Sequence, residues 1–146
     1  MIDKKHIGRT IADFSTTTSA GQLRFFAKAT GETRPEYLDE AAARDAGHPG
    51  LPLPPTWLFS LELLAPPGNW RDEVGIRIER ILHGEQSFTY HRMAYAGDTL
   101  HFEARIADIY DKKGGALEFV VRETRVTNQN GEHVADLRSV IVHRAV

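Results

Sequence analysis

The chain of 146 residues contains no cysteine. This absence excludes disulfides, thiolate nucleophiles and cysteine-ligated metals, and it is typical of a protein from a reducing compartment. Long apolar runs are also missing: none approaches the ~20 residues that span a bilayer. The first six residues, MIDKKH, do not begin the apolar segment of a secretory signal. We therefore expect a cytoplasmic protein.

Neither sign of charge is in clear excess, since the chain has 18 Lys and Arg residues and 20 Asp and Glu residues. A nucleic-acid-binding chain should show a basic excess or a basic stripe, so this class is disfavoured. The seven histidines are scattered, without His-x-x-x-His spacing, and we expect no metal site. Gly-rich phosphate loops and Gly-x-Ser-x-Gly elbows are absent as well. The length predicts a single domain over residues 1–146.

Helical signals fill the first half of the chain. Ser19 and Gln22 have the spacing of a capping box, and Gly31 is well placed to end the helix that follows. A second, short helix is predicted over residues 39–45, with an aspartate at its start. The apolar stretch at 55–64 opens on prolines and is apolar on most sides, which predicts a buried helix.

From Val74 onward the hydrophobic period changes to two, which is typical of strands. Two intervening segments, 111–115 and 128–131, are rich in the Asp, Asn and Gly of tight turns. We predict an antiparallel meander with one face buried, which curls around the buried helix in an α+β domain. The alternating sets are Val74, Ile76 and Ile78 with Phe88 and Tyr90 in the same arm; Leu100, Phe102, Ala104 and Ile106; Leu117, Phe119 and Val121; and Leu137, Ser139 and Ile141.

Five segments occur together in an order that resembles the MaoC-like dehydratase family. They are ATGETRPEY at 29–37, LPPTW at 53–57, LHGEQSFTY at 82–90, AGDTL at 96–100 and NGE at 130–132. More narrowly, they look like its N-terminal-half branch, which is related to the dehydratase domains of fatty-acid synthases. The resemblance implies a hot-dog fold, in which a curled antiparallel sheet wraps one long central helix at 55–64. It also implies (R)-type hydration or dehydration of an acyl thioester on coenzyme A or acyl carrier protein, with no further cofactor.

Hydration of an enoyl thioester needs a base for water, an acid for the α-carbon and donors for the carbonyl oxygen. Catalytic members that this chain resembles supply an Asp and, five residues later, a His. Here Glu32 and Tyr37 stand at those catalytic positions, and Arg34 stands where Asn is usual. A carboxylate displaced by about 1 Å can cost ~100-fold in rate. A phenol of ordinary pKa, ~10, shuttles protons poorly near neutral pH.

The resemblance also implies substrate-binding roles for five residues. The family takes its carbonyl-oxygen donors from backbone N–H groups at the helix start, but proline has no N–H. Such donors must therefore come from Thr56, Trp57 or a partner chain. The predicted substrate-binding residues are Arg34, Pro55, Thr56, Trp57 and His83.

Each of these motifs also has a plain structural interpretation. The segment at 32–35 could be a solvated loop, and Tyr37 a half-buried loop aromatic. Gly84 beside His83 could simply allow a strand bulge, and Gly97-Asp98 a turn before a strand. Lys112 and Lys113 are typical of a solvated hairpin tip, with contact to coenzyme phosphates as the alternative.

Three functions fit the altered dyad. The chain could be the acyl-binding half of a hydratase whose catalytic half is a separate hot-dog polypeptide. It could be a self-sufficient hydratase with Glu32 as base, or a non-catalytic module that binds acyl thioesters. A thioesterase on the same fold has no motif in its favour. An isolated hot-dog sheet exposes an edge strand, so we expect a homodimer or a heterodimer with another hot-dog subunit.

Overall fold

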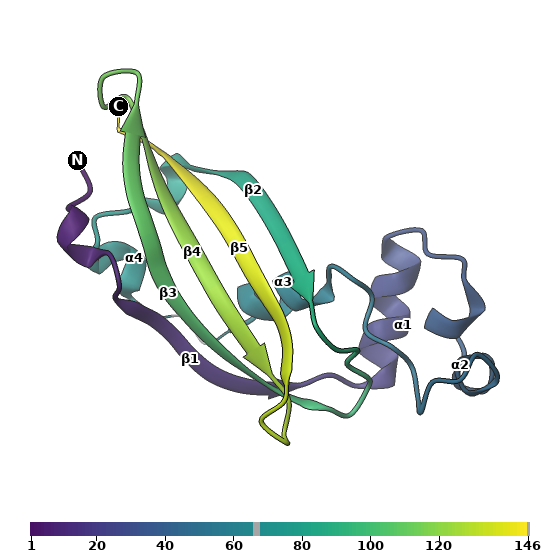
Figure 1. Ribbon diagram of the computed structural model, residues 1–146. Helices are drawn as coiled ribbons and strands as arrows, with labels where there is room; N and C mark the ends of the chain where they lie inside the picture. Colours follow the sequence, from purple (N-terminus) through teal and green to yellow (C-terminus); the bar gives the residue numbers. More distant parts are fainter. Residues whose placement is uncertain (66–67, 146) are drawn as a thin grey trace.

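A five-stranded antiparallel sheet forms the body of the protein in the computed structural model, which describes residues 1–65 and 68–145. Its strands follow the order β1-β3-β4-β5-β2 and curve strongly along their length (Figure 1). β1 and β2 are therefore the two edges. The strands are β1 (Thr10–Thr17), β2 (Ile81–Tyr90), β3 (Thr99–Lys112), β4 (Leu117–Thr127) and β5 (His133–Arg144).

Short helices connect the strands and cover one face of the sheet. The α-helices are α1 (Ala20–Ala29), α2 (Glu40–Asp45), α3 (Trp57–Leu63) and α4 (Trp70–Glu73), and three 3-10 turns are η1 (Lys4–His6), η2 (Pro35–Tyr37) and η3 (Ile78–Arg80). α3 is the buried central helix, and α1 and α2 lie together beyond one end of the sheet (Figure 1). No helix within the described ranges is long and apolar enough to cross a bilayer. The α+β hot-dog architecture predicted from the sequence is confirmed.

The central helix is shorter than the resemblance implied. α3 has seven residues, and the chain at Pro55 and Thr56 is a turn. Proline cannot donate a backbone hydrogen bond, and the first N–H to do so here is that of Trp57, which bonds to the Pro54 carbonyl at 3.0 Å. The predicted stop at Pro66-Pro67 lies outside the described residues.

α1 begins and ends as its sequence predicts. The Ser19 hydroxyl accepts from the Gln22 backbone N–H at 3.3 Å, and the Gln22 side chain accepts from the Ser19 N–H at 2.9 Å. Gly31 follows the helix with a φ of 75°, a conformation that glycine adopts without strain. The shorter α2 is capped by the Asp39 side chain, also as expected.

The strand predicted from Val74 to Ile78 is wrong. α4 ends at Glu73, and Gly75 has a φ of 83°, with the Ile76 N–H returning to the Arg71 carbonyl at 2.8 Å. This is a helix-ending turn followed by η3, so the alternation of apolar residues there reflects burial of Val74 and Ile76 in loops. β2 begins only at Ile81.

The buried face of β4 is also opposite to the one predicted. A bulge in β3 between Ile106 and Asp108 changes the phase of that strand, so that Ile109 faces inward opposite Val120. Phe119 instead stacks on Tyr110 on the other face, with ring centroids 4.8 Å apart. Some of the inward-facing residues of β4 are polar. They can be buried because they are paired inside the protein. Arg122 meets Glu62 of α3 at 3.0 Å, and Glu118 meets His143 of β5 at 3.0 Å.

Two glycine motifs are structural, as the plain interpretation predicts. The register of β2 against β5 shifts between His83 and Glu85, which confirms a bulge at Gly84. At the start of β3, Gly97 has a φ of 90°, and the Asp98 carboxylate accepts from the Tyr95 backbone N–H at 2.8 Å. Lys113 lies in the β3–β4 turn with a φ of 54°, consistent with a hairpin tip.

Candidate functional site

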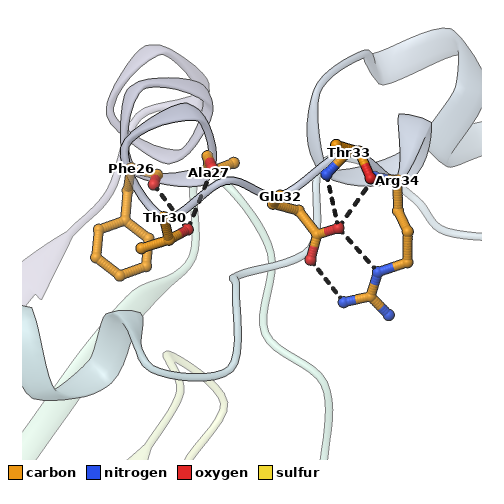
Figure 2. Close-up of polar contacts among 6 residues, drawn as sticks. All are labelled: Phe26, Ala27, Thr30, Glu32, Thr33 and Arg34. Carbon is orange, nitrogen blue, oxygen red and sulfur yellow. Dashed lines mark hydrogen bonds and ion pairs between the residues drawn. The ribbon is translucent and has the colours of Figure 1, made fainter.

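Glu32 directly follows the glycine that ends α1, and its carboxylate turns back onto its own loop. One oxygen accepts from the backbone N–H groups of Thr33 and Arg34 and from the Arg34 Nε, each at 3.0 Å. The other oxygen accepts from the Arg34 Nη2 at 2.7 Å. Figure 2 shows the carboxylate and the guanidinium aligned in this two-point contact. All of these donors come from the next two residues of the chain, so the arrangement is local.

The donors lower the proton affinity of Glu32. The Arg34 side chain first, and then the Arg34 backbone N–H, lower the pKa of Glu32 to about 2. The same contact raises the pKa of Arg34 above its usual range. A general base works best when its pKa lies near the operating pH. Glu32 in this geometry is therefore a weak base that is suited to holding Arg34 in place.

Tyr37 is buried rather than half-buried, with 8% of its surface exposed. The Arg34 guanidinium lies 4.6 Å from the centroid of the Tyr37 ring, which is a cation–π contact. The Tyr37 backbone N–H bonds to the Arg34 carbonyl at 3.2 Å, which closes η2. Arg34 thus joins the two dyad positions, with Glu32 at its edge and Tyr37 under its face.

Tyr90 at the end of β2 extends this group to the start of α3. Its hydroxyl donates a hydrogen bond to the Pro55 carbonyl. Burial of the hydroxyl, with a smaller contribution from the nearby Tyr37, raises the pKa of Tyr90 to about 12. Reasoning from the sequence did not select Tyr90 as a site residue, although it closes one of the segments that carry the family resemblance. Its contact with Pro55 spans a distance in sequence that no local pattern reveals.

The remaining predicted substrate-binding residues separate into different environments. The Trp57 side chain lies in the core, where its Nε1–H donates to Thr18 at 2.9 Å and its ring meets Phe26 edge-on. Thr56 and Trp57 were the expected N–H donors to the carbonyl oxygen of the substrate. The Trp57 backbone N–H is already bonded to the Pro54 carbonyl, so only the Thr56 N–H of this pair remains as a candidate. His83 is exposed on β2 and packs its ring edge-on against Phe59 of α3, with centroids 5.6 Å apart.

Two cavities lie elsewhere on the protein, and neither is lined by Glu32 or Tyr37. The larger, of about 540 Å³, lies over charged residues of β3, β4 and β5 such as Arg105, Glu123 and Arg138. The smaller, of about 360 Å³, lies between β1 and α3 and includes Phe14, Leu61 and Leu64 in its lining. Neither of these two cavities therefore brings the predicted dyad positions together with a bound acyl chain.

The curled sheet and buried helix define a hot-dog domain of the MaoC-like dehydratase class. A sequence model described as "FAS1-like, dehydratase domain region" matches residues 5–137, so the chain belongs to this family. A UPF0336 protein of Streptomyces coelicolor is 35% identical over 125 residues, which cover 85% of this chain and 82% of that protein.

Solved structures share the fold. The HadBC (3R-hydroxyacyl-ACP dehydratase) complex of Mycobacterium tuberculosis contains a chain that is 26% identical, with a TM-score of 0.76. The match covers 91% of this chain and 92% of that one. A protein described as a MaoC-like dehydratase gives a TM-score of 0.80 at 24% identity, covering 95% of this chain and 42% of that one. The chain therefore has the fold of dehydratase subunits, including one that works in a complex.

Proposed function

We propose that this chain is the acyl-binding subunit of a heteromeric (R)-specific hydratase or dehydratase that acts on acyl thioesters. The observation that carries the proposal is the state of Glu32. Its carboxylate is paired at two points with Arg34 and has a pKa of about 2, so it is poorly suited to take a proton from water. The catalytic Asp and His would then come from a second hot-dog subunit.

The β2 edge offers a surface for such a partner. It is an edge strand, and Leu82 in it is 52% exposed, close in sequence to Ile78 at 70%. An unpaired edge with exposed apolar side chains is a site for association. The opposite edge, β1, is mostly Thr, Ser and Asp on its exposed positions, which favours β2 as the contact. The similarity to a chain of the HadBC complex supports an assembly of hot-dog subunits.

Co-expression with a MaoC-like protein that carries the intact Asp and His tests the proposal. The two chains should co-purify, and the complex should hydrate crotonyl-CoA or a longer trans-2-enoyl thioester, seen as loss of the enone absorbance. Asn in place of the partner's Asp should abolish the activity, whereas Glu32→Gln should leave it within about threefold. Flat traces from every complex, or activity of this chain alone that Glu32→Gln abolishes, would refute the accessory role.

A self-sufficient hydratase requires Glu32 to leave Arg34 before it can act as a base. The Glu32→Gln assay on the isolated chain separates this alternative from the proposal, because a positioned base costs ~100-fold or more when removed. A non-catalytic binding module would be stabilised against heat by an acyl thioester but would show no turnover, either alone or with a catalytic partner. An acyl thioester at a hundredfold its dissociation constant should add about 2.7 kcal/mol to the free energy of unfolding.

A further inference from the structure

Two histidines and an aspartate meet where β2 ends and β5 begins. His91 directly follows β2, His133 is the first residue of β5, and Asp136 lies three residues further on. The His91 Nε2 lies 2.8 Å from one Asp136 carboxylate oxygen, and the His133 Nε2 lies 2.8 Å from the other. The two imidazole rings are 4.2 Å apart between centroids. Both rings thus direct the same nitrogen at one carboxylate.

The backbone that carries these side chains is firmly held. The N–H groups of His91 and Arg92 both bond to the Val134 carbonyl, at 2.9 and 3.2 Å. Val134 and Ala135, which lie between the two ligands on β5, are fully buried. The turn before His133 is closed by the Asn128 side chain, which accepts from the backbone N–H groups of Asn130 and Glu132. The backbone positions of the cluster are therefore fixed by the sheet before any ligand arrives.

We propose that His91, His133 and Asp136 form a site for a divalent transition-metal cation, of which Zn²⁺ fits best. Two imidazole nitrogens and one carboxylate oxygen are a donor set that zinc accepts, with water as the fourth ligand. Their donor atoms all lie within 4.8 Å of one another. In a tetrahedral site with ligand distances of ~2.0–2.2 Å, neighbouring donors are roughly 3.3 Å apart. The present spacing of 2.8 Å between each histidine nitrogen and the carboxylate is shorter than this, so the side chains must move apart to admit the ion.

Charged residues of both signs surround the cluster. The nearest cation on the same segment, Arg92, is paired with Glu132 at 3.2 Å. Arg125 is the neighbour of Asp136 across β4, and Thr89 is its neighbour across β2. The cluster is partly exposed, with 40% of the His91 side chain and 26% of the His133 side chain accessible, so an ion can enter.

The site was not expected from the sequence, which predicts no metal because the histidines are scattered. His91 and His133 are far apart in the chain, and antiparallel pairing of β2 with β5 brings them together. A bound ion would join the end of one strand to the start of the other and so fasten the β2 edge. This role is independent of the hydratase proposal, because none of the three residues belongs to the Glu32 group.

Calorimetric titration of the tag-free, metal-stripped chain with ZnCl₂ tests the site. We expect one ion per chain and a rise in the melting temperature with added zinc. Gln in place of both His91 and His133 keeps an amide that can bond to Asp136 but removes the imidazole ligands. This double variant should bind zinc at least a hundredfold more weakly and lose the thermal shift. Cobalt(II) bound to the unaltered chain should show the intense visible absorption of a tetrahedral ion.

His101→Gln is the matched control. His101 lies 3.4 Å from the Asp13 carboxylate and so forms an exposed His–Asp pair without a second imidazole. Its loss should leave zinc affinity and stoichiometry unchanged. Absence of binding to the unaltered chain, or equal binding by the double variant, would show that the cluster is a hydrogen-bonded His–Asp–His group only and would overturn the proposal.

Discussion

The Glu32 carboxylate is surrounded by donors that stabilise its charged form. Three of them come from Arg34, and the fourth is the backbone N–H of Thr33. The geometry that makes Glu32 a poor proton acceptor also makes it a fixed anchor for Arg34 over the Tyr37 ring. At the scale of single residues, the Glu32 carboxylate therefore holds the Arg34 side chain in place.

The low pKa of Glu32 predicts a pH-dependent contribution to stability. A carboxyl whose pKa falls from 4.5 to about 2 on folding stabilises the protein above pH 4.5 and loses that effect as the pH drops toward 2. Glu32→Gln should therefore be less stable than the unaltered chain near neutral pH, with the difference shrinking as the pH falls below 4.5. Urea denaturation at several pH values measures this. Arg34→Gln should weaken the same dependence, and a difference that stays constant with pH would contradict the assignment.

The β2 strand depends on a single glycine at its bulge. A Cβ at Gly84 would lie 2.8 Å from the Val142 Cγ2 and 3.0 Å from the Val140 carbonyl oxygen on the neighbouring β5. The close approach of β2 to β5 at this point leaves no room for a side chain. The bulge therefore requires glycine, because any side chain at this position would collide with β5.

Gly84→Ala should destabilise the protein by about 1–3 kcal/mol, because a methyl group forced into a packed contact displaces the strand. Equilibrium denaturation by urea measures the loss. Gly50→Ala provides the control, since a Cβ there meets nothing within 4 Å and Gly50 does not have a positive φ. The control should stay within about 0.5 kcal/mol of the unaltered chain. Equal effects of the two substitutions would mean that the contact at β5 is unimportant.

At the scale of the whole molecule, the two edges of the sheet differ. The β2 edge carries the exposed Leu82 and follows the exposed Ile78, whereas the β1 edge is largely polar. α3 and α4 lie over one face of the sheet, and no strand of the sheet pairs with the outer side of β2 (Figure 1). An unpaired edge with an exposed leucine is consistent with the pairing that we propose.

Leu82→Lys should weaken that pairing, because a lysine at the contact must lose its hydration when a partner covers it. Light scattering should report a shift toward the monomer mass, both for this chain alone and for its complex with the catalytic subunit. The free energy of unfolding of the monomer should change by no more than about 0.5 kcal/mol, since Leu82 is half exposed. Ile7→Lys alters an apolar residue of similar exposure near the other edge and should leave the mass unchanged. Retained assembly in Leu82→Lys would place the contact elsewhere.

Features that depend on interactions between residues close in the chain could be predicted from the sequence. Ser19 and Gln22 cap α1, Gly31 ends it and Gly97 turns the chain before β3 because each acts on backbone within a few residues. The regular alternation of Leu100 to Ile106 likewise marked the buried face of β3. The family resemblance predicted the dyad positions at Glu32 and Tyr37, and this assignment stays a prediction.

Features that depend on strand register were decided only by the tertiary structure. The buried face of β4 carries Val120, opposite Ile109 of β3, and not the predicted Phe119, and the Gly75 turn replaced a strand that the alternation after Val74 had indicated. The contact of Tyr90 with Pro55 and the meeting of His91 with His133 join segments that are distant in the chain. No local pattern encodes such contacts, because a one-residue shift in pairing exchanges the two faces of a strand. The sequence by itself determined the ends of α1, the cap of α2, the turns around β3 and the family; folding decided which side chains share a site.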